Sequence, residues 1–360
     1  MLEDKSILFT CAGFGGGISK MIRYVSSICT GEFKHVFLLH RGRESKNDVA
    51  PEGVQEIEVP VDFNENTPCW RWKQICGIRR EIKRVHPDAV CCFGSEQALM
   101  VALAMIGLKD IKLIQCDRGD PYTLSKKWHI LAKWAFRRAD NCVFQLEKQG
   151  RWYGDKVMLC SAVIPNAFIP TGEVKPYKGK RNKTIVSVGR FSPEKQYEVL
   201  IDAFREVHTR HPEYRLILHG EGPSREKYNA MIAEYGLKDC VELPGYAYDA
   251  MNAIRNEGIF VLSSLREGIP NALIEALAMG IPTVSTDCTP GGPDFLTNHG
   301  RRGLIVPVND SKAMATSICK IIENPDLAAS LSNLGQEIIP LLEKEYISKL
   351  WLDFFKKVLN

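Results

Sequence analysis

Short apolar runs alternate along the chain with longer stretches in which apolar residues recur every three or four positions. Short runs rich in β-branched and aromatic residues are typical of buried strands, and a period of about 3.6 residues is typical of helices with one apolar side. In the first half, the pattern predicts strands at residues 6–12, 34–40, 89–93, 111–116 and 141–145, and helices at residues 18–29, 69–85, 96–106, 126–138 and 147–153. Strands that alternate with helices predict a parallel sheet covered by helices.

The alternation begins again after residues 164–183, a segment rich in Pro and Gly that predicts a linker. Predicted strands follow at residues 184–188, 215–219, 241–243, 259–263 and 283–285. A chain of 360 residues is also too long for one ordinary core. We therefore expect an α/β fold of two Rossmann-like, doubly wound parallel-sheet domains facing a cleft, over residues 1–164 and 165–345. A last helix within about residues 346–360, apolar on one side, is expected to pack back on the first domain.

Composition and charge narrow the class of protein. An apolar fraction of 45% and a charged fraction of 25% are those of a soluble globular protein, and a net charge of +4 does not by itself indicate nucleic-acid binding. Residues 67–156 nevertheless hold 17 Lys and Arg against 9 Asp and Glu, which predicts a local basic surface facing phosphates or an anionic membrane. Twelve Cys without a C-x-x-C pair favour reduced, buried thiols. Because no signal-peptide pattern and no membrane-spanning apolar run occur, we expect a cytoplasmic protein, working at the inner face of the plasma membrane.

Charged residues follow the first predicted strand of the second half. In open parallel sheets, ligands bind beyond the carboxyl ends of the strands. Arg190 comes directly after the strand at residues 184–188, and Lys195 lies five residues later near the start of a helix. Two cations beside a helix start can neutralise a diphosphate, although a solvated helix start explains these residues equally well. The turn that follows the next strand contains Gly222, whose backbone could hold a flat base, although ordinary turn chemistry explains this glycine equally well.

Two acids flank a glycine turn after the strand at residues 259–263. Glu267 stands in the turn, and Glu275 lies on the second turn of an otherwise apolar helix, where a carboxylate needs a partner. A carboxylate can accept two hydrogen bonds from a vicinal diol, which suits a ribose or a hexose. Backbone N–H groups at the helix start, those of Gly268, Ile269, Asn271 and Ala272, are expected to point at an anion or at sugar oxygens. Pro270, within the same segment, has no N–H and can contribute only its carbonyl. The alternative is a surface Glu and a Glu that interacts only with the helix dipole.

Together these segments resemble the retaining glycosyltransferases of family four, which have the GT-B fold. The matching residues are Ser187-Val-Gly-Arg190 with Lys195, the turn His219-Gly-Glu-Gly-Pro223, and Glu267 and Glu275 with seven residues between them. The resemblance implies that Arg190 and Lys195 bind the diphosphate, that Glu267 binds the transferred sugar, and that Glu275 binds the ribose. It also implies retention of the anomeric configuration and no metal or other cofactor, and the chain has no D-x-D motif.

The first half offers two further candidate segments. The loop with Gly15, Gly16 and Gly17 lacks the third Gly of a dinucleotide fingerprint, and the resemblance implies that it lines the cleft and touches donor phosphates or the acceptor. Asp117 and Arg118 follow the strand at residues 111–116 and are expected to bind and orient substrates, with simple loop solvation as the alternative. Retaining transfer without a covalent intermediate is expected to need little acid–base machinery, because the departing diphosphate can take the acceptor's proton.

The predicted function is transfer of a hexose or N-acetylhexosamine from a nucleotide sugar, with UDP expected, to a glycan or lipid-linked glycan in surface polysaccharide biosynthesis. Helices that mix Trp with Lys and Arg, at residues 70–84 and 126–138, predict contact with an anionic membrane, unless Trp128, Leu131 and Trp134 are buried in the core. No nucleic-acid partner is expected. The alternatives are a nucleotide-sugar epimerase of the UDP-GlcNAc type and a non-catalytic sugar-binding protein.

Overall fold

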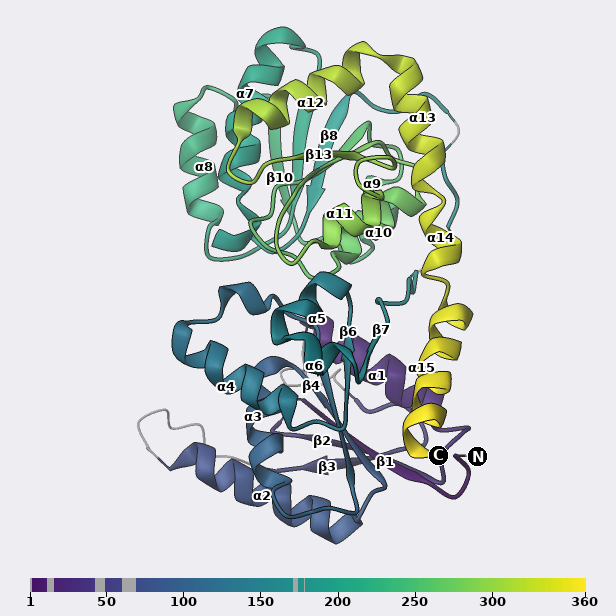
Figure 1. The fold of residues 1–360 in the computed structure, drawn as a ribbon. Helices are drawn as coiled ribbons and strands as arrows, with labels where there is room; N and C mark the ends of the chain where they lie inside the picture. Colours follow the sequence, from purple (N-terminus) through teal and green to yellow (C-terminus); the bar gives the residue numbers. More distant parts are fainter. Residues whose placement is uncertain (1, 12–15, 43–48, 60–68, 171–173, 178) are drawn as a thin grey trace. The chain divides into compact units, whose positions relative to one another are not determined.

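The computed structural model describes residues 2–11, 16–42, 49–59, 69–170, 174–177 and 179–360. The chain divides into two compact units (Figure 1): unit 1 comprises Met1–Asn166 and Glu345–Asn360, and unit 2 comprises Ala167–Lys344. Each unit has its own parallel sheet and its own apolar core.

The described residues of unit 1 form a seven-stranded sheet in the order β3-β2-β1-β4-β5-β6-β7, with every neighbouring pair parallel. Its strands are β1 (Ser6–Cys11), β2 (His35–His40), β3 (Val54–Glu58), β4 (Ala89–Phe93), β5 (Lys112–Asp117), β6 (Asn141–Phe144) and β7 (Ser161–Val163). Its helices are α1 (Gly16–Cys29), α2 (Trp70–Val85), α3 (Ser95–Ala104), η1 (Pro121–Thr123), α4 (Lys126–Arg137), α5 (Glu147–Tyr153), α6 (Asp155–Met158) and α15 (Lys344–Leu359). The strand order reverses at β1, as in a doubly wound sheet.

The last helix, α15, contributes to the core of unit 1. Trp351 is fully buried, and its ring stacks on Phe93 at the end of β4 with ring centroids 6.0 Å apart. Phe355 packs edge-on against Phe9 of β1, with centroids 6.2 Å apart. The apolar side of α15 therefore covers the middle of the first sheet.

The described residues of unit 2 form a six-stranded parallel sheet in the order β10-β9-β8-β11-β12-β13. Its strands are β8 (Thr184–Val188), β9 (Arg215–His219), β10 (Val241–Gly245), β11 (Ile259–Leu262), β12 (Thr283–Thr286) and β13 (Leu304–Val306). Its helices are η2 (Pro193–Lys195), α7 (Tyr197–Arg210), α8 (Arg225–Glu234), α9 (Ala250–Ile254), α10 (Asn271–Ala278), α11 (Gly292–Thr297), α12 (Ser311–Glu323), α13 (Pro325–Gly335) and α14 (Ile338–Leu341). The prediction of two doubly wound α/β sheets is confirmed.

Three strands were not predicted from the sequence, namely β3, β7 and β13, and all three lie at a sheet edge. An edge strand buries fewer side chains, so its sequence need not be apolar, as the acidic β3 (VQEIE) shows. In the described part of the chain, no helix combines the length and the apolar character that crossing a membrane requires.

Candidate active site

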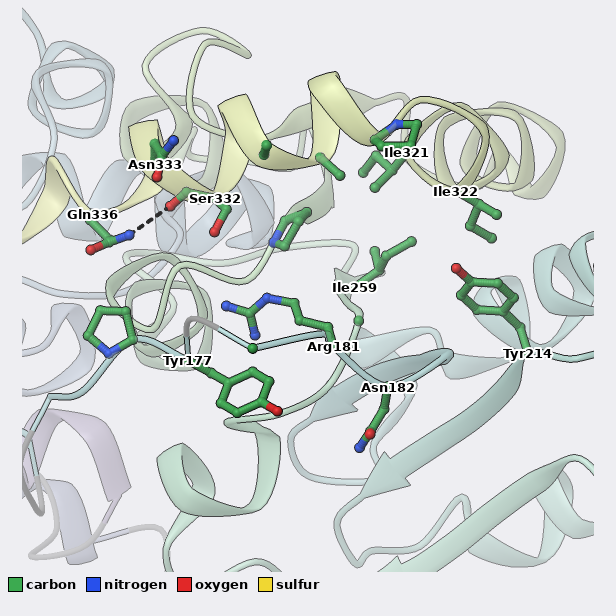
Figure 2. Close-up of a pocket in the computed structure, with 17 residues that line it drawn as sticks. Tyr177, Arg181, Asn182, Tyr214, Ile259, Ile321, Ile322, Ser332, Asn333 and Gln336 are labelled. Atoms are coloured by element: carbon green, nitrogen blue, oxygen red, sulfur yellow. Dashed lines mark hydrogen bonds between the residues drawn. The ribbon is translucent and has the colours of Figure 1, made fainter.

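In the sheet of unit 2, we call the side on which the strands begin the amino edge and the side on which they end the carboxyl edge. These two edges differ in the groups that they offer to a ligand. At the amino edge, a cavity of about 840 Å³ lies between the segment before β8 and helix α13 (Figure 2). Arg181 lies in this cavity, but its guanidinium donates hydrogen bonds to four carbonyl oxygens, those of Arg255, Glu257, Met279 and Gly280. Arg181 thus connects the C-terminal ends of α9 and α10 by hydrogen bonds. The predicted site lies at the carboxyl edge of the sheet.

At the carboxyl edge, the turns after β8, β9 and β10 are joined by backbone hydrogen bonds. The amide of Gly189 donates to the carbonyl of His219 at 3.0 Å, and the amide of Gly220 donates to the carbonyl of Gly245 at 2.8 Å. A Cβ atom at Gly222 would lie 2.4 Å from the carbonyl oxygen of Phe191, so only glycine allows this approach. The three turns therefore form one continuous surface that includes the predicted base-binding residue Gly222.

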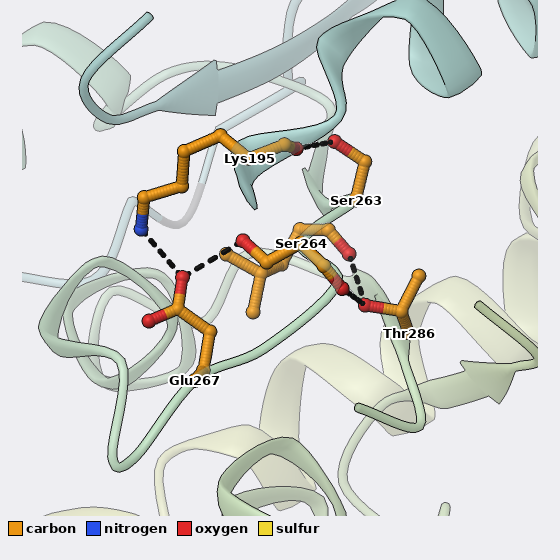
Figure 3. Close-up of polar contacts among 6 residues, drawn as sticks. Lys195, Ser263, Ser264, Glu267 and Thr286 are labelled. Carbon is orange, nitrogen blue, oxygen red and sulfur yellow. Dashed lines mark hydrogen bonds and ion pairs between the residues drawn. The ribbon is translucent and has the colours of Figure 1, made fainter. Parts of the chain in front are cut away.

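The two predicted cations occupy different positions on this surface. Arg190 is exposed directly after β8. Lys195 is the last residue of the 3₁₀ turn η2 and not part of a helix start, because Gln196, with φ of 47°, separates it from α7. The Nζ atom of Lys195 lies 2.5 Å from Oε1 of Glu267 (Figure 3). The structure thus brings together one predicted cation and one predicted acid that lie far apart in the sequence.

Hydroxyl groups that the sequence did not single out hold this ion pair in place. Ser264 donates from Oγ to the same Glu267 oxygen at 2.7 Å, and Ser263 donates from Oγ to the carbonyl of Lys195 at 2.7 Å. Thr286, at the end of β12, donates from Oγ1 to the carbonyl of Ser264 at 2.5 Å. Their position directly after or at the end of buried strands is the signal that would have revealed them.

The surroundings of the pair are partly screened from water. The Lys195 and Glu267 side chains are 23% and 14% exposed, so their attraction is stronger than that of a surface pair. Burial raises the pKa of the neighbouring Tyr197, and the negative charge of Glu267 adds to this rise. Burial also acts to raise the pKa of Glu194, but the Ser192 hydroxyl and the charges of Arg266 and Lys195 outweigh it and lower the pKa.

Helix α10 begins at Asn271, with Pro270 at its N-cap. The amides of Leu273 and Ile274 both donate to the carbonyl of Pro270, so the amides of Asn271 and Ala272 precede the first hydrogen bonds of the helix.

Close backbone packing fixes the turn before α10. A Cβ atom at Gly292 would lie 1.6 Å from the carbonyl oxygen of Gly268, so α11 can approach this turn only through a glycine. Ile269 in the same turn is buried, and Glu275 is half-buried one turn further along α10. The predicted site residues of unit 2 therefore lie on connected segments of one edge, and their ligand contacts stay predictions.

In unit 1, the side chains of Asp117 and Arg118 are buried at the end of β5. Asp117 accepts hydrogen bonds from the hydroxyl of Tyr153 at 2.6 Å and from the amide of Gly119 at 3.0 Å, and burial raises its pKa against these contacts. Arg118 donates to the carbonyl of Ile164 at 2.8 Å and lies over the ring of Trp351 at 5.2 Å, and burial lowers its pKa to about 10. In the structure both residues hold unit 1 together, and their role toward a substrate stays a prediction.

The predicted glycine-rich loop is only partly covered by the described residues. Gly16 and Gly17 are the first residues of α1, whereas Gly15 lies outside the described residues.

The chain resembles known proteins along both units. Residues 172–338 match the family model of glycosyl transferases group 1. An exopolysaccharide phosphotransferase of Streptomyces coelicolor is 31% identical over 225 residues, which are 61% of this chain and 24% of that protein. The Escherichia coli glycosyltransferase WcaL, named for colanic acid biosynthesis, is 32% identical over 184 residues, which are 49% of this chain and 42% of that protein. The chain thus spans less than half the length of these two relatives.

Solved structures extend the similarity to the whole fold. Anabaena HepE, crystallised in complex with UDP, superposes with a TM-score of 0.82 over 98% of this chain and 100% of its own, at 16% identity. These matches do not favour an epimerase or a non-catalytic sugar-binding protein. Residues 172–338 thus match the glycosyl transferases group 1, and the whole chain has the fold of GT-B glycosyltransferase structures.

Proposed function

We propose that the chain transfers a hexose or N-acetylhexosamine from a UDP-sugar to a glycan or lipid-linked glycan, with retention of the anomeric configuration. The observation that carries the proposal is the Lys195–Glu267 ion pair at the carboxyl edge of unit 2, with Arg190 exposed on the turn before it. Two cations can neutralise a diphosphate, and a carboxylate can accept hydrogen bonds from sugar hydroxyls. Structures of HepE with UDP and with UDP-glucose support UDP as the nucleotide.

In the proposed reaction, the bond from the anomeric carbon to the diphosphate breaks while the acceptor oxygen bonds to the same face of that carbon. Negative charge then grows on the departing diphosphate, where Arg190 and Lys195 stabilise it. Glu267 binds the sugar, Glu275 binds the ribose, and the amides at the start of α10 bind sugar and phosphate oxygens. The diphosphate takes the acceptor's proton, so that no side chain has to act as a base.

We propose Asp117 and Arg118 as positioning residues of unit 1. Asp117 fixes the amide of Gly119, and the side-chain amide of Gln149 donates to the carbonyl of Gly119 at 2.8 Å. The two contacts hold the turn after β5 from both sides. Asp117 would therefore orient this turn toward a substrate without touching the substrate itself, and Arg118 is fixed beside it by its hydrogen bond to the carbonyl of Ile164.

The class of acceptor follows from the relatives. The names of the two similar proteins refer to exopolysaccharide and to colanic acid biosynthesis. We therefore propose an acceptor from surface polysaccharide biosynthesis, in agreement with the expectation from the sequence.

A donor screen tests this proposal. We expect UDP and one or more UDP-sugars to raise the unfolding temperature of unit 2, since a ligand that binds only the folded state stabilises it by mass action. GDP- and ADP-sugars should give smaller shifts. In the presence of the best donor and extracted lipid-linked glycans, UDP release should be unchanged by EDTA, because Arg190 and Lys195 supply the positive charge that a metal would otherwise provide.

Three results would contradict parts of the proposal. Absence of both binding and turnover with every donor contradicts a nucleotide-sugar enzyme. Conversion of the donor alone into an isomeric nucleotide sugar indicates an epimerase. Loss of UDP release in EDTA, restored by a divalent cation, contradicts catalysis without a metal.

We further propose that unit 1 contacts anionic lipid through α2 and α4. Helix α3 lies between them and packs against both. Trp72, Ile130 and Trp134 are 66%, 73% and 37% exposed. Trp128 and Leu131 are only half-buried, so the alternative that the core buries Trp128, Leu131 and Trp134 does not hold. Lys126 and Lys127 are also exposed at the start of α4. Apolar side chains beside cations can insert at the boundary between headgroups and acyl chains.

Co-sedimentation with vesicles tests this contact. The protein should bind phosphatidylglycerol vesicles in low salt and be released as the ionic strength rises. Ile130→Glu should lower the bound fraction several-fold, whereas Leu159→Glu, at a residue that is 89% exposed in unit 1, should not. Equal binding of Ile130→Glu and the unchanged protein, or equal binding to phosphatidylcholine, would refute the proposal.

A further inference from the structure

Three side chains of different chemistry converge at the amino edge of the second sheet. His211 follows α7, whereas Cys319 and Glu323 lie on the last turns of α12, which packs against α7. One ligand atom from each residue lies within 4.8 Å of the others. This edge is opposite to the one that carries Lys195 and Glu267.

The distances suit a small divalent ion. The Nε2 atom of His211 lies 3.1 Å from Oε1 of Glu323. In a tetrahedral zinc site, with bonds of about 2.1 Å to nitrogen and oxygen and about 2.3 Å to sulfur, neighbouring ligand atoms are about 3.3–3.6 Å apart. The histidine and glutamate are therefore already near the required spacing. The Cys319 sulfur lies within 4.8 Å of both, so it has to approach them by about 1.2 Å at most to reach about 3.6 Å.

The surroundings also suit an ion. Cys319 is buried, the His211 side chain is 17% exposed and that of Glu323 is 47% exposed, so a water molecule can reach a fourth coordination position. Arg210 donates to Glu323 Oε1 at 2.6 Å, which is the kind of outer contact that fixes a ligating carboxylate. The charged groups that interact electrostatically with the Cys319 thiol are the carboxylates of Glu206 and Glu323 and the guanidinium of Arg210.

We propose that His211, Cys319 and Glu323 bind one Zn²⁺ ion that joins the ends of α7 and α12. Nitrogen, sulfur and oxygen ligands together favour a borderline ion such as zinc over magnesium or calcium, which prefer oxygen alone. When the zinc–sulfur bond forms, the Cys319 thiol releases its proton to solvent. The ion stabilises unit 2 from the edge away from the transfer site, so the inference does not depend on the proposed function.

Cobalt is the spectroscopic probe for this site, because Co²⁺ occupies zinc sites and a thiolate ligand gives an intense charge-transfer absorption. Two exposed cysteines, Cys69 at the N-cap of α2 and Cys76 within α2, are first changed to serine to remove competing thiols. We expect the full chain to show the thiolate band with one equivalent of Co²⁺ and to lose it when one equivalent of Zn²⁺ is added. Zn²⁺ should also raise the unfolding temperature of unit 2.

Three variants in the same background locate the ion. Cys319→Ser should abolish the band, and His211→Gln, which keeps the thiol, should weaken Co²⁺ binding at least tenfold. Cys240→Ser, at another buried cysteine of unit 2, should leave the band unchanged. Absence of a thiolate band in the parent protein overturns the proposal, as does a band of equal strength in folded Cys319→Ser or unchanged affinity in His211→Gln.

Discussion

Replacing Glu275 with alanine is expected to weaken the binding of UDP about 100-fold while unit 2 stays folded. Glu275 is half-buried on α10, between residues that the core buries, and its carboxylate is proposed to accept two hydrogen bonds from the ribose diol. A hydrogen bond to a charged group contributes about 1.5–3 kcal/mol, so losing two of them costs at least about 3 kcal/mol. Each 1.4 kcal/mol corresponds to a tenfold change in affinity, which gives the expected factor.

Isothermal titration calorimetry with UDP measures this effect, and circular dichroism checks the fold. Glu226→Ala, at an exposed glutamate in the first turn of α8, is the matched control and should bind UDP normally. Glu275→Gln keeps one acceptor and should show an intermediate loss. If folded Glu275→Ala binds UDP with unchanged affinity, Glu275 does not hold the ribose.

Replacing Lys195 with alanine is expected to lower kcat by about two to three orders of magnitude, with a smaller change in KM. The ammonium is proposed to stabilise charge that grows on the diphosphate only in the transition state, and removing one such group costs about 10²–10³ in rate. The variant also leaves Glu267, whose side chain is 14% exposed, without its cation at 2.5 Å. The sugar-binding carboxylate then loses the contact that orients it.

Steady-state rates with the best donor of the screen measure the effect of Lys195→Ala. Lys183→Ala is the control, because Lys183 also pairs with a glutamate of unit 2, Glu213, but both side chains are largely exposed. This control should keep a normal rate. A kcat of Lys195→Ala within threefold of the unchanged protein would show that Lys195 plays no part in the transfer step.

The sequence predicted the central strands better than the edges. Strands β4, β8 and β9 were predicted with their observed bounds. In β4 and β8 nearly every residue is buried, and an apolar run buried on both faces has a clear beginning and end. The missed strands β3, β7 and β13 pair with one neighbour only. Their presence depends on the strand beside them, which is a tertiary effect that a local pattern does not contain.

The candidate site was predictable as a set of segments but not as a set of contacts. The contact between Lys195 and Glu267 exists because β8 and β11 are neighbours in the sheet, and residue spacing alone cannot reveal that neighbourhood. The burial of Arg118 was likewise hidden, since Trp351, which covers it, comes from the far end of the chain. Sequence patterns identify charged groups after strands, whereas burial depends on distant partners.

Unit 1 is built from two segments that lie far apart in the sequence, and this affects the order in which the units can fold during synthesis on the ribosome. All residues of unit 2, from Ala167 to Lys344, emerge before the second segment of unit 1, Glu345–Asn360, does. Unit 2 can therefore reach its native state while the first sheet still lacks Trp351 and Phe355, and its apolar surface around Phe9 and Phe93 stays uncovered. The half of the protein that is translated first is thus the half whose core is completed last.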